Sequence, residues 1–158
     1  MIERYAISPL KELWKLKAQY ERWLEVELAV VKAYEETGRA PAGTAEKIRS
    51  KARIDVEGIA EIEEVVDHDV IAFIKYVTRE MGDEARYFHL GLTSSDIVDT
   101  ALSLAVRESG LAIIQALTEL SQALGEQALI YKDTVCMGRT HGIHAEPTSF
   151  GLKFLSFM

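Results

Sequence analysis

The sequence contains little cysteine or proline, with one cysteine, Cys136, and three prolines among 158 residues. A single cysteine cannot form a disulfide within the chain, and no signal-peptide pattern opens the sequence, so we expect a reducing, cytoplasmic setting. The unbroken apolar runs are also much too short to span a bilayer, which predicts no membrane partner.

An excess of basic residues is missing as well. Lysine and arginine number 18 against 25 acidic residues, giving a formal net charge of −7. Nucleic-acid-binding surfaces need clustered lysine and arginine, so we expect no nucleic-acid partner. Small anions remain possible ligands, because a few placed arginines and helix N-termini suffice to bind them.

Alternation of apolar and polar residues, the mark of half-buried strands, is not convincing in any segment. Spacings of three and four instead predict helices over residues 10–38, 45–52, 55–66 and 70–81. We expect Ser8 to cap the first of these, with Pro9 at the first helical position. Gly38 provides a plausible stop.

The longest apolar periodicity runs from Ile97 to about Tyr131, after a run of capping residues at Thr93–Asp96. A helix of this length extends roughly 50 Å and needs partner helices along it, which indicates a bundle and other subunits. We therefore predict an all-α fold, with a small N-terminal helical domain over residues 1–92. Residues 93–158 would form the first part of a long-helix bundle.

Three polar clusters could carry chemistry: Asp67-His68-Asp69, the stretch from His89 to Asp96, and the stretch from Arg139 to His144. Histidine titrates nearest neutrality, so it can act as an acid or a base at working pH. Carboxylates beside His68 would favour its protonated form. The hydroxyls and N–H groups at a helix start suit a carboxylate or a phosphate.

Each cluster also has a purely structural explanation, because serine, threonine and aspartate commonly cap helices and loops connect them. His141 and His144 have the spacing of two metal ligands on one helical turn, yet no cysteine or carboxylate follows at zinc-like spacing. We expect no metal site. Residue types alone indicate an anion-binding helical protein with acid–base histidines.

Taken together, two stretches resemble the first two motif regions of the fumarase/aspartase superfamily: Gly91–Asp96 (GLTSSD) and Gly138–Gly151 (GRTHGIHAEPTSFG). Within this superfamily, Arg4-Tyr5 and the segment His68–Phe73 resemble the lyases of purine biosynthesis. The resemblance covers essentially the whole chain. It implies an all-α homotetramer in which each active site takes residues from three subunits.

The same resemblance implies that fumarate is released from a small-molecule substrate, a succinylated purine nucleotide or precursor, without a metal or organic cofactor. By position, His141 matches the general acid that protonates the departing nitrogen, and His68 matches a histidine that assists it. The other matching positions are substrate contacts: Arg4 and Tyr5 at the nucleotide phosphate, Asp69 at the nucleotide, Thr93 and Ser94 at a succinyl carboxylate, and His89 and Thr140 at the substrate.

One motif of the superfamily is missing, a mobile Ser-Ser-x-Met-Pro-x-Lys loop whose serine is the general base. The sequence ends within an apolar run, Phe150 to Met158. We therefore expect an N-terminal portion of a longer enzyme that is inactive by itself. Two alternatives stay open: argininosuccinate lyase or another fumarate-releasing lyase, and a non-catalytic helical assembly module.

Overall fold

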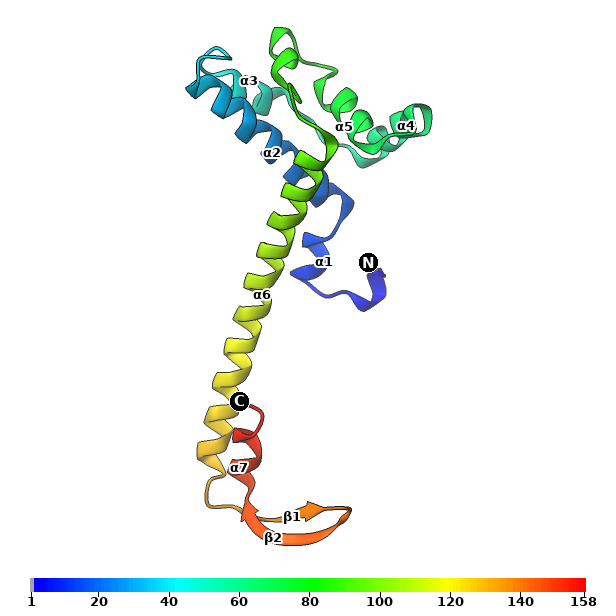
Figure 1. The fold of residues 1–158 in the computed structure, drawn as a ribbon. Coiled ribbons are helices and arrows are strands. Elements are labelled where there is room, and N and C mark those ends of the chain that lie inside the picture. Colours follow the sequence, from blue (N-terminus) through cyan, green and yellow to red (C-terminus); the bar gives the residue numbers. More distant parts are fainter. Residues whose placement is uncertain (1) are drawn as a thin grey trace. The chain divides into compact units, whose positions relative to one another are not determined.

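The computed structural model describes residues 2–158, with the backbone alone described for Glu3. The chain divides into two compact units, Met1–Ser109 and Gly110–Met158. The first unit holds a 3-10 turn and five helices before α6: η1 (Glu3–Tyr5), α1 (Leu10–Leu13), α2 (Leu16–Glu36), α3 (Thr44–Lys51), α4 (Val56–Val66) and α5 (Asp69–Thr78). A second 3-10 turn, η2 (Asp83–Tyr87), follows (Figure 1).

Helix α6 (Ser94–Ile130) begins in the first unit and continues into the second. The second unit then adds β1 (Val135–Thr140), β2 (Ile143–Ser149) and α7 (Phe150–Leu155). The predicted all-α class is confirmed, with a two-stranded sheet as a small addition. The domain boundary between residues 92 and 93 stays a prediction, although α6 does begin there.

An aromatic cluster forms the core of the first unit. Trp23 of α2 meets Tyr20 edge-on, with 5.2 Å between ring centroids, and meets Phe73 of α5 at 5.4 Å. Phe88 packs on Phe73 from the segment that follows η2, at 6.1 Å. Ile97 extends this core from the first turns of α6, where it is completely buried.

Most predicted helices are confirmed, but the single helix expected over residues 10–38 is wrong. The chain breaks between α1 and α2, where Lys15 has extended backbone angles. The predicted Ser8 cap is also wrong, because Pro9 occupies the N-cap of α1 and no side chain caps it. Apolar spacing continues across this break, so periodicity alone could not reveal it.

The segment from Val135 to Ser149 is an antiparallel β-hairpin, whereas the sequence predicted no strand and an irregular connection. Its register pairs Val135 with Ser149 and Thr140 with Ile143, with a bulge between Met137 and Arg139. The alternation test failed here because most hairpin side chains are exposed on both faces. A strand without a buried face has no need for an apolar period of two.

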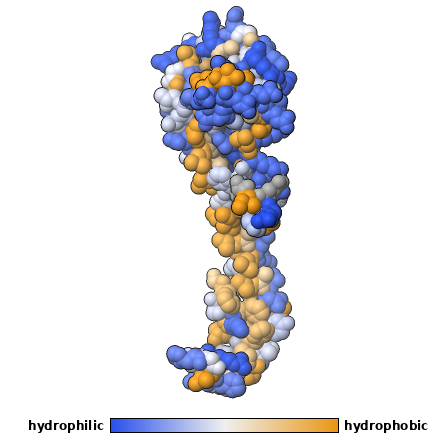
Figure 2. Space-filling model, turned by 90° about the vertical axis from the view of Figure 1, so that its right-hand side faces the viewer, coloured by the Kyte–Doolittle hydropathy of each residue, from blue (hydrophilic) through white to orange (hydrophobic). Residues whose placement is uncertain are grey.

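Apolar side chains remain exposed along α6 within the second unit. Figure 2 shows apolar surface gathered along this part of the helix. The exposed members are Leu111, Ile113, Ile114, Leu117, Leu120, Leu129 and Ile130. Contiguous exposed apolar surface of this kind is typical of an interaction surface.

Two glycines in this region provide a matched stability test. Gly151 is buried where α7 meets the end of α6, and an added Cβ would collide with the Ala128 carbonyl and lie 2.8 Å from the Lys132 backbone. We expect Gly151→Ala to destabilise the chain by about 1–3 kcal/mol, as overpacking does. Gly110, inside α6, has open space around it. Gly110→Ala should stabilise by about 1 kcal/mol through helix propensity.

Urea unfolding of the two alanine variants beside the parent protein measures both effects. The same substitution is thus expected to change the free energy of unfolding in opposite directions at two glycines of one unit. Equal stability of the two variants would contradict the close packing of α7 on α6.

The ion pair between Lys51 of α3 and Glu84 of η2 makes stability depend on pH. Lys51 Nζ lies 2.5 Å from Glu84 Oε1, and the Gly82 N–H donates to the same oxygen at 3.2 Å. The pKa of Glu84 is lowered from 4.5 to about 2, and the hydrogen bond from Lys51 makes the largest contribution. Because the pKa of Glu84 is lower in the folded state than in the unfolded chain, its ionised form stabilises the fold when the pH is above 4.5. This contribution is lost as the pH falls through about 2.

We therefore expect Glu84→Gln to be less stable than the parent at neutral pH, with a difference that shrinks as the pH falls toward 2. Lys51→Gln should lose much of the same pH-dependent difference, because it removes the partner. Denaturant unfolding at a series of pH values measures the difference. A difference that does not change between neutral and strongly acidic pH would contradict the assigned role of the pair.

Candidate functional site

The predicted site residues occur in both units, and each unit is described by itself. Seven lie in the first unit: Arg4, Tyr5, His68, Asp69, His89, Thr93 and Ser94. Thr140 and His141 lie in the second. In the first unit, the side chains of His68 and Asp69 are in contact. His89 lies close enough to the start of α6 to lower the pKa of Asp96 there.

His68 is the N-cap residue of α5. Its Nδ1 accepts a hydrogen bond from the Ile71 N–H at 3.4 Å and also lies 3.4 Å from Asp69 Oδ1. An unprotonated Nδ1 suits the first contact, and a protonated one suits the second. The side chain is about half exposed, so it is accessible to a substrate or to water.

His89 is held by a carboxylate from a distant part of the sequence. Glu27 of α2 accepts from the His89 N–H at 2.8 Å through one oxygen, and its other oxygen lies 2.6 Å from His89 Nδ1. Glu27 is completely buried. Burial raises the pKa of Glu27, while the hydrogen bonds from His89 act in the opposite direction.

Thr93 is engaged by a neighbouring carboxylate. Its N–H and its hydroxyl both donate to Asp96 Oδ2, at 2.7 and 3.1 Å. These bonds lower the pKa of Asp96, and His89 adds a smaller effect in the same direction. The donors predicted to hold a substrate carboxylate therefore already hold a carboxylate of the chain itself. An incoming carboxylate has to displace Asp96 from Thr93.

Arg4 and Tyr5 lie together in η1. The Arg4 guanidinium carbon is 4.8 Å from the centre of the Tyr5 ring, and 71% of Tyr5 is exposed. A guanidinium beside an exposed ring is suited to a planar or phosphorylated ligand.

His141 and Gly142 form the two-residue turn of the hairpin, with φ angles of 50° and 75°. Two positive φ angles in succession are typical of the tight turns that match strand twist. Thr140 and His141 are both exposed there. At the base of the hairpin the Phe150 N–H donates to the Thr134 carbonyl at 2.8 Å, which anchors the strands.

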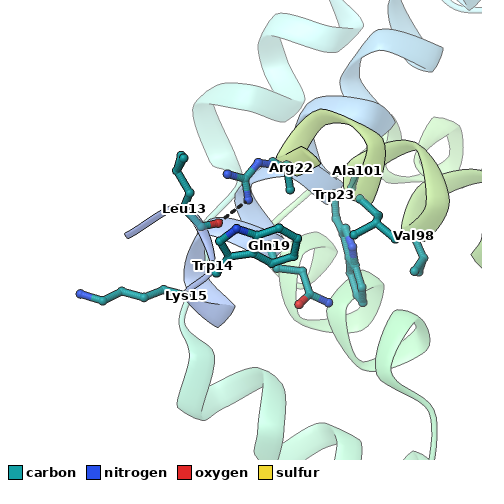
Figure 3. Close-up of a pocket in the computed structure, with 10 residues that line it drawn as sticks. Leu13, Trp14, Lys15, Gln19, Arg22, Trp23, Val98 and Ala101 are labelled. Atoms are coloured by element: carbon teal, nitrogen blue, oxygen red, sulfur yellow. Dashed lines mark hydrogen bonds between the residues drawn. The ribbon is translucent and has the colours of Figure 1, made fainter. Parts of the chain in front are cut away.

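A cavity lined by α1, α2 and α6 contains no predicted site residue. It has a volume of about 140 Å³ and lies between α1, α2 and the first half of α6 (Figure 3). Trp14, Arg22 and Trp23 line it. Arg22 donates to the Leu13 carbonyl at 2.8 Å and pairs with Glu108 of α6 at 2.5 Å, so this region serves helix packing.

Residues 2–158 contain no group of three histidine, cysteine or acidic residues that could hold a metal ion. In the same part of the chain no helix is long and apolar enough to cross a membrane. The expected absence of a metal and of organic cofactors stays a prediction.

Sequence reasoning did not single out Glu27, the buried partner of His89. A signal was present, because this glutamate lies four positions after Trp23 and four before Val31, on the buried stripe of α2. A charged residue at such a position needs a partner to offset its desolvation. The identity of that partner, 62 positions away, was not predictable from the pattern.

Comparison with known proteins gives one family. A model of the family described as Lyase matches residues 5–158. Adenylosuccinate lyase from Thermotoga maritima is 54% identical over 157 residues, and adenylosuccinate lyase from Aquifex aeolicus is 44% identical over 156 residues. These alignments cover 99% and 97% of this chain and 36% of each relative.

Solved structures show the same fold. A fumarate lyase from Mesorhizobium sp. BNC1 has a TM-score of 0.88 at 28% identity, covering 96% of this chain and 37% of that protein. A 3-carboxy-cis,cis-muconate lactonizing enzyme from Pseudomonas putida has a TM-score of 0.85 at 27% identity, covering 99% and 37%. The resemblance found in the sequence motifs is confirmed. Because the family model spans nearly every residue, the chain belongs to this lyase family.

Proposed function

We propose that the full-length protein containing this chain is a lyase that cleaves adenylosuccinate to AMP and fumarate. The same site would cleave the succinyl-aminoimidazole-carboxamide ribotide to its carboxamide ribotide and fumarate. The observation that carries the proposal is the identity of 44–54% with adenylosuccinate lyases along almost the whole chain. The chain spans about a third of those relatives, so the activity is proposed for the complete protein.

The reaction is a β-elimination. A base removes a proton from the carbon next to a succinyl carboxylate, and the electron pair forms the double bond of fumarate as the C–N bond breaks. The departing nitrogen takes a proton from an acid. Negative charge builds on the carboxylate during proton removal, so oriented donors that face this group lower the barrier.

Thr93 and Ser94 are assigned to that carboxylate. They stand at the start of α6, where the helix N-terminus adds N–H groups and a positive dipole end. The bonds from Thr93 to Asp96 support the assignment, since the same N–H and hydroxyl could donate to a substrate carboxylate once Asp96 is displaced.

His141 is assigned as the general acid, assisted by His68, with Thr140 beside it as a substrate contact. Arg4, Tyr5 and Asp69 are assigned to the nucleotide, and His89 to a further substrate contact. Exposure of His141 at the hairpin tip supports a role in a site completed by other chain segments. The general base is assigned to a region outside this sequence.

We further propose that the complete protein is a homotetramer in the cytoplasm. The exposed apolar residues of α6 support assembly, because a bundle of such helices from several subunits would cover them. The single cysteine supports a reducing compartment.

Substrate identity is tested first. Full-length protein is offered adenylosuccinate and argininosuccinate in separate assays, and fumarate is followed by absorbance. We expect release from adenylosuccinate, and none from the 158-residue chain by itself. Release from argininosuccinate alone would contradict the nucleotide assignments of Arg4, Tyr5 and Asp69. Release from neither would contradict the proposed function.

The histidine assignments are tested by His141→Ala and His68→Ala in the full-length protein. We expect each to lower kcat by about 10²- to 10⁴-fold, the range for loss of a positioned acid or base. Val135→Thr is the matched hairpin control, because 78% of Val135 is exposed at the far end of β1. Its kcat should stay close to that of the parent.

Size-exclusion chromatography and circular dichroism accompany these assays, and the oligomeric mass should be unchanged in every variant. Turnover close to the parent in both histidine variants would remove those histidines from the mechanism.

A further inference from the structure

Glu27 is a charged side chain placed among core residues. It lies on α2 between Trp23 and Val31, and none of its surface is exposed. Removing a carboxylate from water is costly unless its oxygens receive hydrogen bonds. Both Glu27 oxygens face groups of one residue, His89, whose N–H and Nδ1 lie 2.8 and 2.6 Å away.

The segment that carries His89 has an unusual backbone. His89 itself has a φ of 57°, and Gly91 has a φ of 72°. A side chain from the same face of α2, Tyr34, donates its hydroxyl to the Leu90 carbonyl at 2.5 Å. Glu27 and Tyr34 are seven positions apart, about two helical turns, so α2 fixes this segment at two points.

The two anchors act on different atoms. Tyr34 holds the Leu90 carbonyl and does not bond to the imidazole. Glu27 holds both the His89 backbone and its ring. An ionised carboxylate can only accept hydrogen bonds, so its contact with Nδ1 favours a proton on Nδ1. In the neutral ring the lone pair is then on Nε2. The side chain of His89 is 16% exposed, which leaves an opening for a ligand.

We propose that Glu27 is the positioning residue of His89, fixing the ring orientation and the Nδ1–H tautomer so that Nε2 faces the substrate. This inference rests on the proposed function for the contact between His89 and the substrate. Carboxylate–histidine pairs elsewhere set a tautomer in the same way, and loss of the carboxylate lowers activity without removing the histidine.

The tautomer is measured directly. Full-length protein carrying ¹⁵N-histidine is examined by long-range ¹H–¹⁵N correlation, and His89 is assigned by its absence from His89→Ala. We expect the Nδ1–H tautomer in the parent protein. In Glu27→Gln the amide offers one oxygen for two donors, so its NH₂ group can donate to Nδ1 and we expect the Nε2–H tautomer to increase.

Tyr34→Phe is the matched control. It removes a hydrogen bond to the same segment and from the same helix face, but leaves the carboxylate in place. The Nδ1–H tautomer should persist in this variant. If Tyr34→Phe changes the tautomer as much as Glu27→Gln does, general loosening of the segment explains the effect and the proposal is wrong.

Activity separates positioning from a purely structural role. We expect Glu27→Gln to lower kcat/KM with adenylosuccinate by about 10- to 100-fold in the parent background. In the His89→Ala background the same substitution should lower kcat/KM almost no further, because Glu27 acts through His89. An equal loss in both backgrounds overturns the proposal.

A parent protein with the Nε2–H tautomer also overturns the proposal, and this result does not depend on whether Glu27→Gln folds. Failure of the proposed function would show itself differently, as no fumarate from adenylosuccinate in the parent protein. The tautomer measurements would still test the pair in that case.

Discussion

The contact between Trp23 and Phe73 is the interaction on which the first unit depends. Trp23 lies on α2 one turn before Glu27, and Phe73 lies on α5 five positions after His68. Phe88 joins the same cluster directly before His89. Loss of this packing would separate the elements that carry Glu27, His68 and His89, so one apolar cluster positions polar groups from distant parts of the sequence.

Left-handed backbone angles occur at or beside three of the histidines predicted for the site. Within residues 2–158, the residues other than glycine with positive φ are Asp67, His89 and His141. Asp67 directly precedes His68, and the other two are themselves histidines predicted for the site. Such angles cost roughly 1 kcal/mol or more each and persist where surrounding contacts hold them. Glu27 provides that hold for His89, and the paired strands provide it for His141.

Sequence periodicity predicted most helices, because their apolar faces are buried and must recur at helical spacing. It failed at the hairpin, where both faces are exposed and no apolar period is required. It also failed at the break before α2, since apolar residues continue across it. The site residues came mainly from motif resemblance, and their roles stay predictions. Residue types alone indicated no more than anion binding and acid–base histidines.

The sequence by itself determined most of the helices, the start of α6 at its capping residues and membership of the lyase family. Each of these depends on neighbouring residues or on a contiguous motif, so a linear pattern carries the information. The tertiary structure alone decided that Glu27 meets His89 and that Arg22 meets Glu108. These are contacts across 62 and 86 positions, set by how the helices pack. The bond from the Thr93 N–H to Asp96 is different, because the Thr-x-x-Asp spacing of a capping box contains it within four neighbouring residues.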